Sequence, residues 1–396
     1  MYKIIKIEQL KIGMYIYDLN RVWEGHPFAW HCFTIENAET LQTIVNSEVG
    51  QVEIDTTLGI DVASETIDSE TPIPEESASA SLVLSKLSPE EEFDHARQLY
   101  SNASKLMQEF MKEVRLGKQV HLEQCGAVVD NIFDSMNRCP SALLPLAQMK
   151  NQDEYTFQHS VSVSALAVAL GYVLELPHNE IKEVVLGGFL HDIGKAKVPG
   201  KILNKPGKLD NAEFAIMRTH VVSTAELLKE VHGLSEVAFN AAAQHHERFD
   251  GSGYPHGLKG DQISLHGQII ALVDVYDAIT SVRVYHKGMP PAEALSKMYE
   301  WRDTHFDARL IQAFIKGIGI YPAGSLVRMS SGKLGIVREI VTDKLLQPIV
   351  EVIFDARKLS YVTPETIDLS TSGDKIVSHE SFEKWGINQA KWYAVQ

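Results

Sequence analysis

The sequence predicts a mainly α-helical chain with a small α/β or β-rich domain at its N-terminus and a small β unit at its C-terminus. Long apolar patterns with helical spacing occupy residues 151–319, short strand-like runs occupy both ends, and residues 64–81 are rich in Ser, Glu, Thr and Pro. We therefore divide the chain into an accessory domain (1–63), an acidic linker (64–87), connecting helices (88–150), a central helical domain (151–319) and a C-terminal β unit with a tail (320–396).

The accessory domain is predicted from strand-like runs at residues 14–17 and 51–54 and a helical pattern at residues 37–46. Four aromatic residues lie between the two runs: Trp23, Phe28, Trp30 and Phe33. We expect a compact core rather than a ligand cage, because a small domain needs the area that aromatic side chains bury. The linker after this domain has almost no large apolar residue and cannot offset the entropy cost of ordering.

Helices are predicted to begin again at Ser88, an N-cap residue followed by Pro89 and by acidic residues in the first turn. They run to about Val114 and then from Leu122 to Met136, and could pack on the central helices or on a second subunit. In the central domain, one helix starts after Pro177 and another is capped at residues 210–211.

Two segments interrupt or end the helical pattern. Residues 249–260 contain four glycines and Pro255, which argue for an ordered loop. After residue 319 the pattern changes to strands at residues 325–329, 335–341 and 349–354, with a turn at Ser330-Ser331-Gly332.

Composition excludes several classes of function. The chain has 396 residues, of which 44% are apolar, and its formal net charge of −15 argues against a general affinity for DNA or RNA. Its three cysteines show no CxxC spacing, so we expect a reducing cytoplasm and no thiolate metal site. No signal-peptide segment follows Met1, and residues 161–176 are too short and polar for a bilayer span. We therefore expect a soluble, cytoplasmic protein that does not bind membranes.

The candidate functional residues centre on His191-Asp192, which follow an apolar run and precede Lys195. On a continuous helix, Lys195 would lie one turn from His191. Such a pair alone is more often structural than metal-binding. Unpaired imidazoles and carboxylates are costly to bury in apolar helical surroundings, and five more occur here: His159, His220, His245, His246 and Asp274.

Five histidines and two aspartates without cysteine suit first-row metals such as iron, manganese or zinc. Seven ligands are too many for one ion, but they suit two divalent metal ions if Asp192 bridges them. A water or hydroxide between two such ions has its pKa lowered toward neutrality and would attack a phosphodiester without a separate side-chain base.

The order of these blocks resembles the HD-GYP subgroup of the HD-domain phosphohydrolases. The resemblance covers about residues 151–319 and rests on His191-Asp192-Ile193-Gly194-Lys195, on Lys205-Pro206-Gly207, on His245-His246-Glu247-Arg248-Phe249-Asp250-Gly251-Ser252-Gly253-Tyr254-Pro255, and on Asp274-Val275-Tyr276-Asp277-Ala278. It implies an HD-type helical bundle with catalytic activity on a cyclic dinucleotide, chiefly cyclic di-GMP and in some members 3',3'-cyclic GMP-AMP. Residues 1–63 resemble a domain of unknown function that accompanies HD-GYP domains.

The resemblance also implies residue roles, with two divalent ions, iron or manganese before other first-row metals. One ion would be held by His159, His191, Asp192 and Asp274, and the other by Asp192, His220, His245 and His246. Lys195 would contact the non-bridging phosphate oxygens, against the alternative of a surface charge. Tyr254 would contact the substrate or brace its loop, and Arg283 would contact phosphate or guanine rather than remain a helix-surface charge. Asp277 would orient a metal ligand or contribute to substrate binding.

Three positions depart from the family pattern. Tyr155 stands where members with a third metal carry Glu, which favours a two-metal centre that opens the ring to a linear dinucleotide. His286 and Gln268 stand where the family usually has a cation. Other histidines match no ligand position and are expected to be surface or packing residues: His26, His31, His178, His232, His256, His266 and His305.

Three functions remain open: a cyclic-dinucleotide phosphodiesterase, a sensor that binds the nucleotide without turnover, and a general HD phosphohydrolase acting on nucleoside phosphates. The presence of all seven predicted ligands favours an enzyme over a sensor. The Gly253-Tyr254-Pro255 loop argues against the general phosphohydrolase. A homodimer and a signalling protein remain open as partners.

Overall fold

The structure is a computed structural model of the chain. The described residues are 2–18, 33–35, 41–42, 44–45, 51–56, 60, 89–118, 121–148, 155–283, 286–341 and 344–392. The chain divides into two compact units, Met1–Leu87 and Ser88–Gln396. The linker predicted at residues 64–87 lies outside the described residues.

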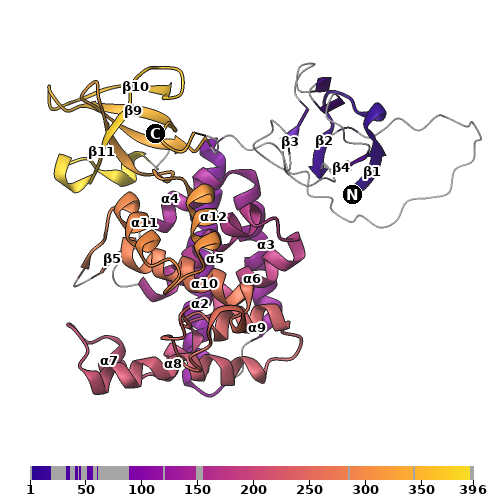
Figure 1. Cartoon of the computed structure of the whole chain (residues 1–396), viewed down its shortest axis with the longest axis vertical. Helices are drawn as coiled ribbons and strands as arrows, with labels where there is room; N and C mark the ends of the chain where they lie inside the picture. The colour runs from indigo at the N-terminus through magenta and orange to yellow at the C-terminus, as the bar shows by residue number, and fades with distance from the viewer. Residues whose placement is uncertain are drawn as a thin grey trace, which may run out of the picture. The chain divides into compact units, whose positions relative to one another are not determined.

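The N-terminal unit contains a four-stranded antiparallel sheet in the order β1-β4-β2-β3 (Figure 1). Its strands are β1 (Tyr2–Lys6), β2 (Tyr15–Asp18), β3 (Phe33–Thr34) and β4 (Gln51–Asp55), with a 3-10 helix η1 (Ile7–Gln9) after β1. The described core of this unit is aliphatic, and Met14, Ile16 and Ile54 are fully buried. The two predicted strands are present, whereas β1 and β3 were not predicted.

Two predictions for this unit fall largely outside the described residues. Trp23, Phe28 and Trp30 are not among them, nor is the side chain of Phe33, so the aromatic core stays a prediction. Within the helix predicted at residues 37–46, residues 41–42 and 44–45 are helical.

The larger unit is a helical bundle with a β extension, which confirms the predicted fold class. Its helices are α2 (Pro89–Arg115), α3 (Leu122–Arg138), α4 (Pro140–Gln148), α5 (Tyr155–Val173), α6 (His178–Leu190), α7 (Gly200–Leu203), α8 (Asn211–Lys229), α9 (Glu236–Ala243), α10 (Leu265–Thr280), α11 (Pro291–Glu300) and α12 (Ala308–Ile318). The sequence did not predict α4, which contains Pro145 in its interior. Two 3-10 helices, η2 (Ile193–Lys197) and η3 (Gly260–Gln262), and the short strands β5 (Val282–Arg283) and β6 (His286–Lys287) complete this part.

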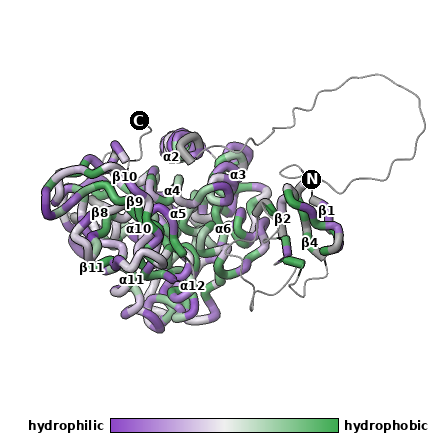
Figure 2. The backbone as a smooth tube through the Cα atoms, turned by 90° about the horizontal axis from the view of Figure 1, so that it is seen from above, coloured by the Kyte–Doolittle hydropathy of each residue, from purple (hydrophilic) through white to green (hydrophobic). Residues whose placement is uncertain are grey.

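Helix α5 runs through the middle of the bundle. It is apolar on nearly all sides, as expected of a helix that other helices surround, and α2, α4, α6, α10 and α12 all contact it. Figure 2 shows the hydrophobic stretches of α5 and α10 inside this unit. No described helix combines the length and the apolar composition needed to cross a membrane.

The connecting helices pack on the bundle of their own chain, which was one of the two arrangements left open. On α2, Tyr100 Oη donates a hydrogen bond to the carbonyl of Gln158 (3.0 Å), and Arg115 Nε donates to the carbonyl of Ala196 (3.3 Å). The ion pair between Glu92 and Arg138 (2.8 Å) joins α2 to α3. Helix α2 therefore contacts both α5 and η2, the two elements that flank the candidate site.

The C-terminal β unit is a five-stranded antiparallel sheet in the order β10-β9-β8-β7-β11. The strands are β7 (Leu326–Met329), β8 (Lys333–Glu339), β9 (Ile349–Asp355), β10 (Ser360–Asp368) and β11 (Ile376–Glu380), followed by η4 (Glu383–Trp385) and η5 (Gln389–Trp392). The predicted turn joins β7 to β8, with Gly332 at φ +84°. Leu326 and Phe354 belong to the core of the helical bundle, so the sheet packs on it. The sequence did not predict β10, which is mostly exposed and contains Pro364, or β11.

Candidate metal centre

Seven predicted side chains converge on one point in the helical bundle. They are His159 on α5, His191 and Asp192 directly after α6, His220 on α8, His245 and His246 after the end of α9, and Asp274 on α10. All are buried except His246, whose side chain keeps 25% of its exposure. Residues up to 115 positions apart in sequence thus share one site, because α5 and α10 pack together and α8 and α9 pack beside them.

The side chains form two groups. The acid-rich group is His159, His191 and Asp192, with Asp274 beside it; His159 Nε2 lies 2.9 Å from Asp274 Oδ1, and His191 Nε2 lies 3.4 Å from Asp192 Oδ2. The imidazole group is His220, His245 and His246, in which the Nε2 atoms of His220 and His245 are 3.4 Å apart.

Asp192 lies between the two groups. Its Oδ2 faces His191 in the acid-rich group, and its Oδ1 lies 3.4 Å from His220 Nε2 in the imidazole group. Asp274 also reaches both groups, because its Oδ1 faces His159 while its Oδ2 lies 3.8 Å from His246 Nδ1. The family pattern assigns Asp274 to one ion alone. In this geometry, one oxygen of Asp274 faces the acid-rich group and the other faces the imidazole group.

Backbone carbonyls orient three of the histidines. The Nδ1 atoms of His191, His220 and His245 donate to the carbonyls three residues earlier, at 2.6, 2.7 and 2.6 Å. The fourth, His159, donates its Nδ1–H to Asp277 Oδ2 at 2.5 Å. Each of these bonds fixes the tautomer and turns the Nε2 lone pair inward, as in histidines that ligate metals.

The residues fit a pair of cations. His191 Nε2 and Asp192 Oδ1 are buried atoms without a hydrogen-bond partner among the described residues, although buried polar atoms normally have one. Inward Nε2 lone pairs and carboxylate oxygens, with no sulfur among them, suit first-row divalent metals.

The segment from His191 to Lys195 is not the continuous helix on which these two residues would lie one turn apart. Helix α6 ends at Leu190, and residues 193–197 form the 3-10 helix η2, so Lys195 Nζ pairs with Asp192 instead of projecting one turn beyond His191. Close packing is the physical reason. A Cβ at Gly194 would lie 2.1 Å from the His220 carbonyl, and Thr224 Oγ1 accepts from Gly194 N (3.0 Å) while donating to the His191 carbonyl (2.9 Å).

A correction concerns His245 and His246, which we expected in helical surroundings. Helix α9 ends at Ala243, and both histidines lie in the turn that follows. The turn lets two consecutive side chains face one point, which a continuous helix does not allow because neighbouring residues diverge by about 100°.

Charges shift the pKa values of the two groups in opposite directions. Burial alone would lower the pKa of His191, but the Asp192 and Asp274 carboxylates outweigh it and raise that pKa. In the imidazole group, burial lowers the pKa of His220 to about 4 and that of His246 to about 3, and burial with neighbouring imidazoles lowers the pKa of His245. The imidazole group is therefore neutral near pH 7.

The aspartates stay ionised despite their burial. Burial would raise the pKa of Asp192, but Lys195 and His191 hold it well below its usual value. Burial also opposes ionisation of Asp274, and the close contacts with His159 and the nearby imidazoles lower its pKa. The site therefore presents two carboxylates and several neutral imidazoles, the protonation states that a cation requires.

The predicted loop at residues 249–260 is confirmed, and it is anchored at the site. Buried Glu247 accepts hydrogen bonds from the backbone N–H groups of His256 (2.8 Å) and Leu258 (3.0 Å). Tyr254 N donates to the His246 carbonyl (3.0 Å), and the rings of Tyr254 and His246 lie 4.7 Å apart. Burial and the charges of Asp274 and Asp192 raise the pKa of Tyr254, so its phenol remains a neutral O–H group.

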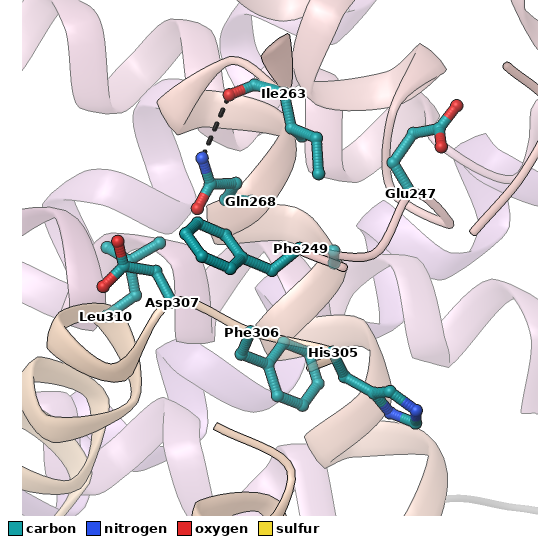
Figure 3. Close-up of a pocket in the computed structure, with 9 residues that line it drawn as sticks. Glu247, Phe249, Ile263, Gln268, His305, Phe306, Asp307 and Leu310 are labelled. Atoms are coloured by element: carbon teal, nitrogen blue, oxygen red, sulfur yellow. Dashed lines mark hydrogen bonds between the residues drawn. The ribbon is translucent and has the colours of Figure 1, made fainter. Parts of the chain in front are cut away.

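A small cavity adjoins this loop (Figure 3). Glu247, Phe249, Gln268, Phe306 and Asp307 are among its lining residues, and none of the seven converging side chains is. Gln268, which replaces a usual cation, donates to the Ile263 carbonyl (3.0 Å), drawn as the dashed line in Figure 3. The cavity therefore lies beside the loop and is separate from the seven converging side chains.

The remaining predicted positions are placed as follows. Asp277 is 3% exposed, so it faces His159 and not solvent. Tyr155 begins α5 and Arg283 ends β5, but the side chains of both, and that of His286, lie outside the described part. Away from the cluster, His178 packs against the rings of Phe133 and Tyr172, and His266 pairs with Glu180.

Comparisons with known proteins identify the family of this chain. The HD domain family matches residues 142–310, and the domain of unknown function DUF3391 matches residues 2–125. A cyclic di-GMP phosphodiesterase of Pseudomonas aeruginosa is 41% identical over 389 residues, which cover 97% of this chain and 94% of the relative. The chain belongs to the HD-GYP family. A 3'3'-cGAMP-specific phosphodiesterase of Vibrio cholerae is 40% identical over 176 residues, 44% of this chain and 41% of that protein.

Sequence reasoning missed two residues of this HD-GYP protein. Glu247 anchors the Gly-Tyr-Pro loop, and its position next to His246 was a signal that could have singled it out. Arg218 lies two residues before His220, and its guanidinium carbon is 4.1 Å from the centre of the Tyr254 ring. No sequence pattern links Arg218 to a residue 36 positions later.

Proposed function

We propose that this chain is a metal-dependent phosphodiesterase that opens a cyclic dinucleotide, cyclic di-GMP or 3',3'-cyclic GMP-AMP, to a linear dinucleotide. The single observation that carries the proposal is the position of Asp192 between two groups of inward-facing imidazoles. The similarity of the whole chain to a cyclic di-GMP phosphodiesterase supports the substrate class.

Two divalent ions are proposed as the cofactor, iron or manganese before other first-row metals. The acid-rich group would hold one ion and the imidazole group the other, with Asp192 shared and Asp274 assigned first to the acid-rich group. When bound, such ions lower the pKa of water and stabilise the charge that develops on a phosphodiester as it is attacked. The chain's own carboxylates and carbonyl-anchored imidazoles supply the geometry.

Lys195 is proposed to stabilise charge on the reacting phosphate. Its Nζ pairs with Asp192, and its side chain is 23% exposed, so the ammonium group lies at the boundary between the buried cluster and solvent. A cation there can contact the non-bridging oxygens, whose charge increases in the transition state. The group does not need to transfer a proton.

Three further residues would position the site and the substrate. Asp277 accepts from His159 and is proposed to orient that ligand rather than to contact the substrate. Tyr254, held against His246, would offer its neutral phenol as a hydrogen-bond donor. Arg283 is proposed as a phosphate or guanine contact on the strength of the family pattern alone.

In the reaction, water adds to phosphorus and the bond from phosphorus to the ribose 3'-oxygen breaks. The departing oxygen takes a proton, and the product is a linear dinucleotide with a 5'-phosphate. Hydrolysis of one phosphodiester opens the ring and leaves the second phosphodiester intact. Tyr155 favours this outcome, because it stands where family members with a third metal carry Glu.

The test is a substrate panel. Anaerobically purified protein loaded with iron or manganese is incubated with cyclic di-GMP, 3',3'-cyclic GMP-AMP or a deoxynucleoside triphosphate, and the products are separated by chromatography. We expect a linear dinucleotide from at least one cyclic substrate. Binding without turnover would support the sensor, and hydrolysis of the triphosphate alone would support a general phosphohydrolase; either result contradicts the proposal.

A further inference from the structure

Arg218 is an exposed cation held in place at the edge of the metal centre. It lies on α8, on the turn that also carries His220, and its guanidinium stacks on the ring of Tyr254 at 4.1 Å. Among the described residues, no carboxylate pairs with it, although the chain has 52 acidic and 37 basic residues. A guanidinium has five N–H donors and no acceptor, and stacking on a ring leaves those donors in its plane free to bind an anion.

Tyr254 links Arg218 to the ligand cluster. The backbone N–H of Tyr254 donates to His246, and its ring lies 4.7 Å from the His246 ring. The preceding Gly253 lies close against the backbone of the segment after His246, because a Cβ there would lie 2.3 Å from Arg248 N. Two contacts of the Tyr254 ring therefore connect the guanidinium of Arg218 to the proposed metal ligand His246. The position of the loop determines both contacts.

The proposed substrate explains why a second anion site is needed. A cyclic dinucleotide carries two phosphodiesters on opposite sides of its ring, and the cluster around Asp192 serves one of them. Lys195 lies at that same cluster, paired with Asp192. The second phosphate must lie elsewhere on the rim, and an unpaired arginine offers the bidentate, charge-assisted hydrogen bonds that suit it.

We propose that Arg218, held in place by Tyr254, binds the second, non-reacting phosphate of the cyclic dinucleotide. The inference rests on the proposed function and deepens it, because it makes Arg218 a specificity-determining residue that distinguishes a ring with two phosphates from a simple phosphodiester. Tyr254 then acts on substrate binding through Arg218 as well as through its own phenol.

The experiment compares two substrates and two arginines. Cyclic di-GMP carries two phosphodiesters, whereas bis(4-nitrophenyl) phosphate carries one and has no second phosphate to bind. Arg218→Gln removes the guanidinium, and Arg218→Lys keeps the charge without the paired N–H donors that bind a phosphate in a bidentate manner. The matched control is Arg302→Gln, which removes an arginine stacked on Tyr299 at 4.5 Å outside the cluster.

We expect Arg218→Gln to lower kcat/KM for cyclic di-GMP by about 10- to 100-fold, mainly through KM, which is the range for a charge-assisted hydrogen bond. Arg218→Lys should lose less of its kcat/KM for cyclic di-GMP. In Arg218→Gln, turnover of bis(4-nitrophenyl) phosphate should change by less than about threefold, because an exposed charge has little effect on a substrate that it does not contact. Metal content and Tm should match the wild type. Equal losses on both substrates, or no loss on cyclic di-GMP, would overturn the inference.

A second measurement separates this inference from the proposed function. Calorimetric binding of cyclic di-GMP to metal-stripped protein should weaken by a similar factor in Arg218→Gln, and the difference should shrink at high salt because Arg218 is exposed. If the wild type binds without turnover, the proposed function fails while a weaker Arg218→Gln still supports the inference. If metal-loaded wild type neither binds nor hydrolyses cyclic di-GMP or 3',3'-cyclic GMP-AMP, both fail.

The role of Tyr254 is tested by a double-mutant cycle. Tyr254→Leu removes the ring on which Arg218 stacks, so we expect it to raise KM for cyclic di-GMP, and Arg218→Gln in that background should add little. Tyr254→Phe keeps the ring and should keep the effect of Arg218→Gln. Full additivity of Tyr254→Leu and Arg218→Gln would contradict the positioning role.

Discussion

The acid-rich group and the imidazole group contain similar ligands in different electrostatic surroundings. Two carboxylates lie beside His191 and raise its pKa, whereas the pKa values of His220, His245 and His246 are lowered by burial. Among the described residues, the carboxylate oxygens that lie within 4 Å of the imidazole group belong to Asp192 and Asp274, so these two would balance the charge of a cation there. The difference implies that the imidazole group would hold the proposed ion more weakly than the acid-rich group.

The largest expected effect comes from removing one ligand of each group. His245→Gln should leave one ion per chain, because the acid-rich group keeps its carboxylates, and turnover should fall by at least about 10³-fold without the paired ions. His159→Gln should instead leave an ion in the imidazole group, and that ion should be held less tightly than the one that remains in His245→Gln. Metal analysis after dialysis against a chelator measures both effects.

His178→Gln is the control for this comparison, since His178 packs on Phe133 and Tyr172 and should keep both ions. Retention of two ions by His245→Gln would break the division into two groups. Loss of the acid-rich ion before the imidazole ion in the wild type would reverse our ranking of their strengths.

Replacing Lys195 should affect rate without affecting metal content. Lys195→Met keeps the apolar stem and removes the charge, so kcat should fall by about 10²-fold, as expected when one electrostatic contact to the transition state is lost. Both ions should remain because Lys195 is not a ligand. An unchanged kcat would show that the lysine serves only to balance the charge of Asp192.

The stability of the metal-stripped protein should depend on pH through the imidazole group. The pKa values of His220 and His246 are lowered to about 4 and about 3 in the folded state, so the unfolded state binds more protons below pH 6.5. The unfolding free energy should therefore fall as pH drops from 6.5 toward 4, by roughly 3 kcal/mol for His220 alone. His191, with a raised pKa, acts in the opposite direction and loses its contribution as pH rises.

Urea unfolding at pH 7, 6 and 5 measures this dependence. The curve for His220→Leu should be flatter than that for the wild type, because one of the groups that takes up protons on unfolding is gone. A wild-type protein that becomes more stable between pH 6.5 and 5 would show that His191 outweighs the imidazole group.

The smallest effect is expected at Thr224, which joins η2 to α8. Thr224→Val leaves Gly194 N without its acceptor and should cost about 1–3 kcal/mol of unfolding free energy. Thr219→Val is the matched control, since Thr219 is exposed and its hydroxyl donates to the Ile216 carbonyl of its own helix. Thermal unfolding distinguishes the two, and equal Tm values would contradict the joining role.

The sequence predicted the helical bundle, its β extension and the residues that converge, because ordered motif blocks and helical periodicity are local signals. Sequence reasoning failed where long-range packing determines the backbone. Gly194 lies against the His220 carbonyl, and this contact, made across 26 residues, changes a continuous helix into η2. The contact of Arg218 with Tyr254 likewise exists only after α8 and the loop meet.

The sheets show the same limit in another form. Strands β7, β8 and β9 were predicted because their buried residues give a clear pattern, whereas β10 is exposed along most of its length and gives none. In the N-terminal unit, the described core consists of aliphatic residues that include Ile5 on the unpredicted β1. We expected aromatic residues in this core and so did not predict β1.

Metal stoichiometry tests the central claim most directly. Protein prepared anaerobically with iron or manganese should carry two ions per chain, and Asp192→Ala should lose both together with turnover of the cyclic dinucleotide, because its two oxygens face the two groups. One or three ions in the wild type, or an Asp192→Ala variant that retains two ions and its turnover, would contradict the claim that Asp192 bridges a metal pair.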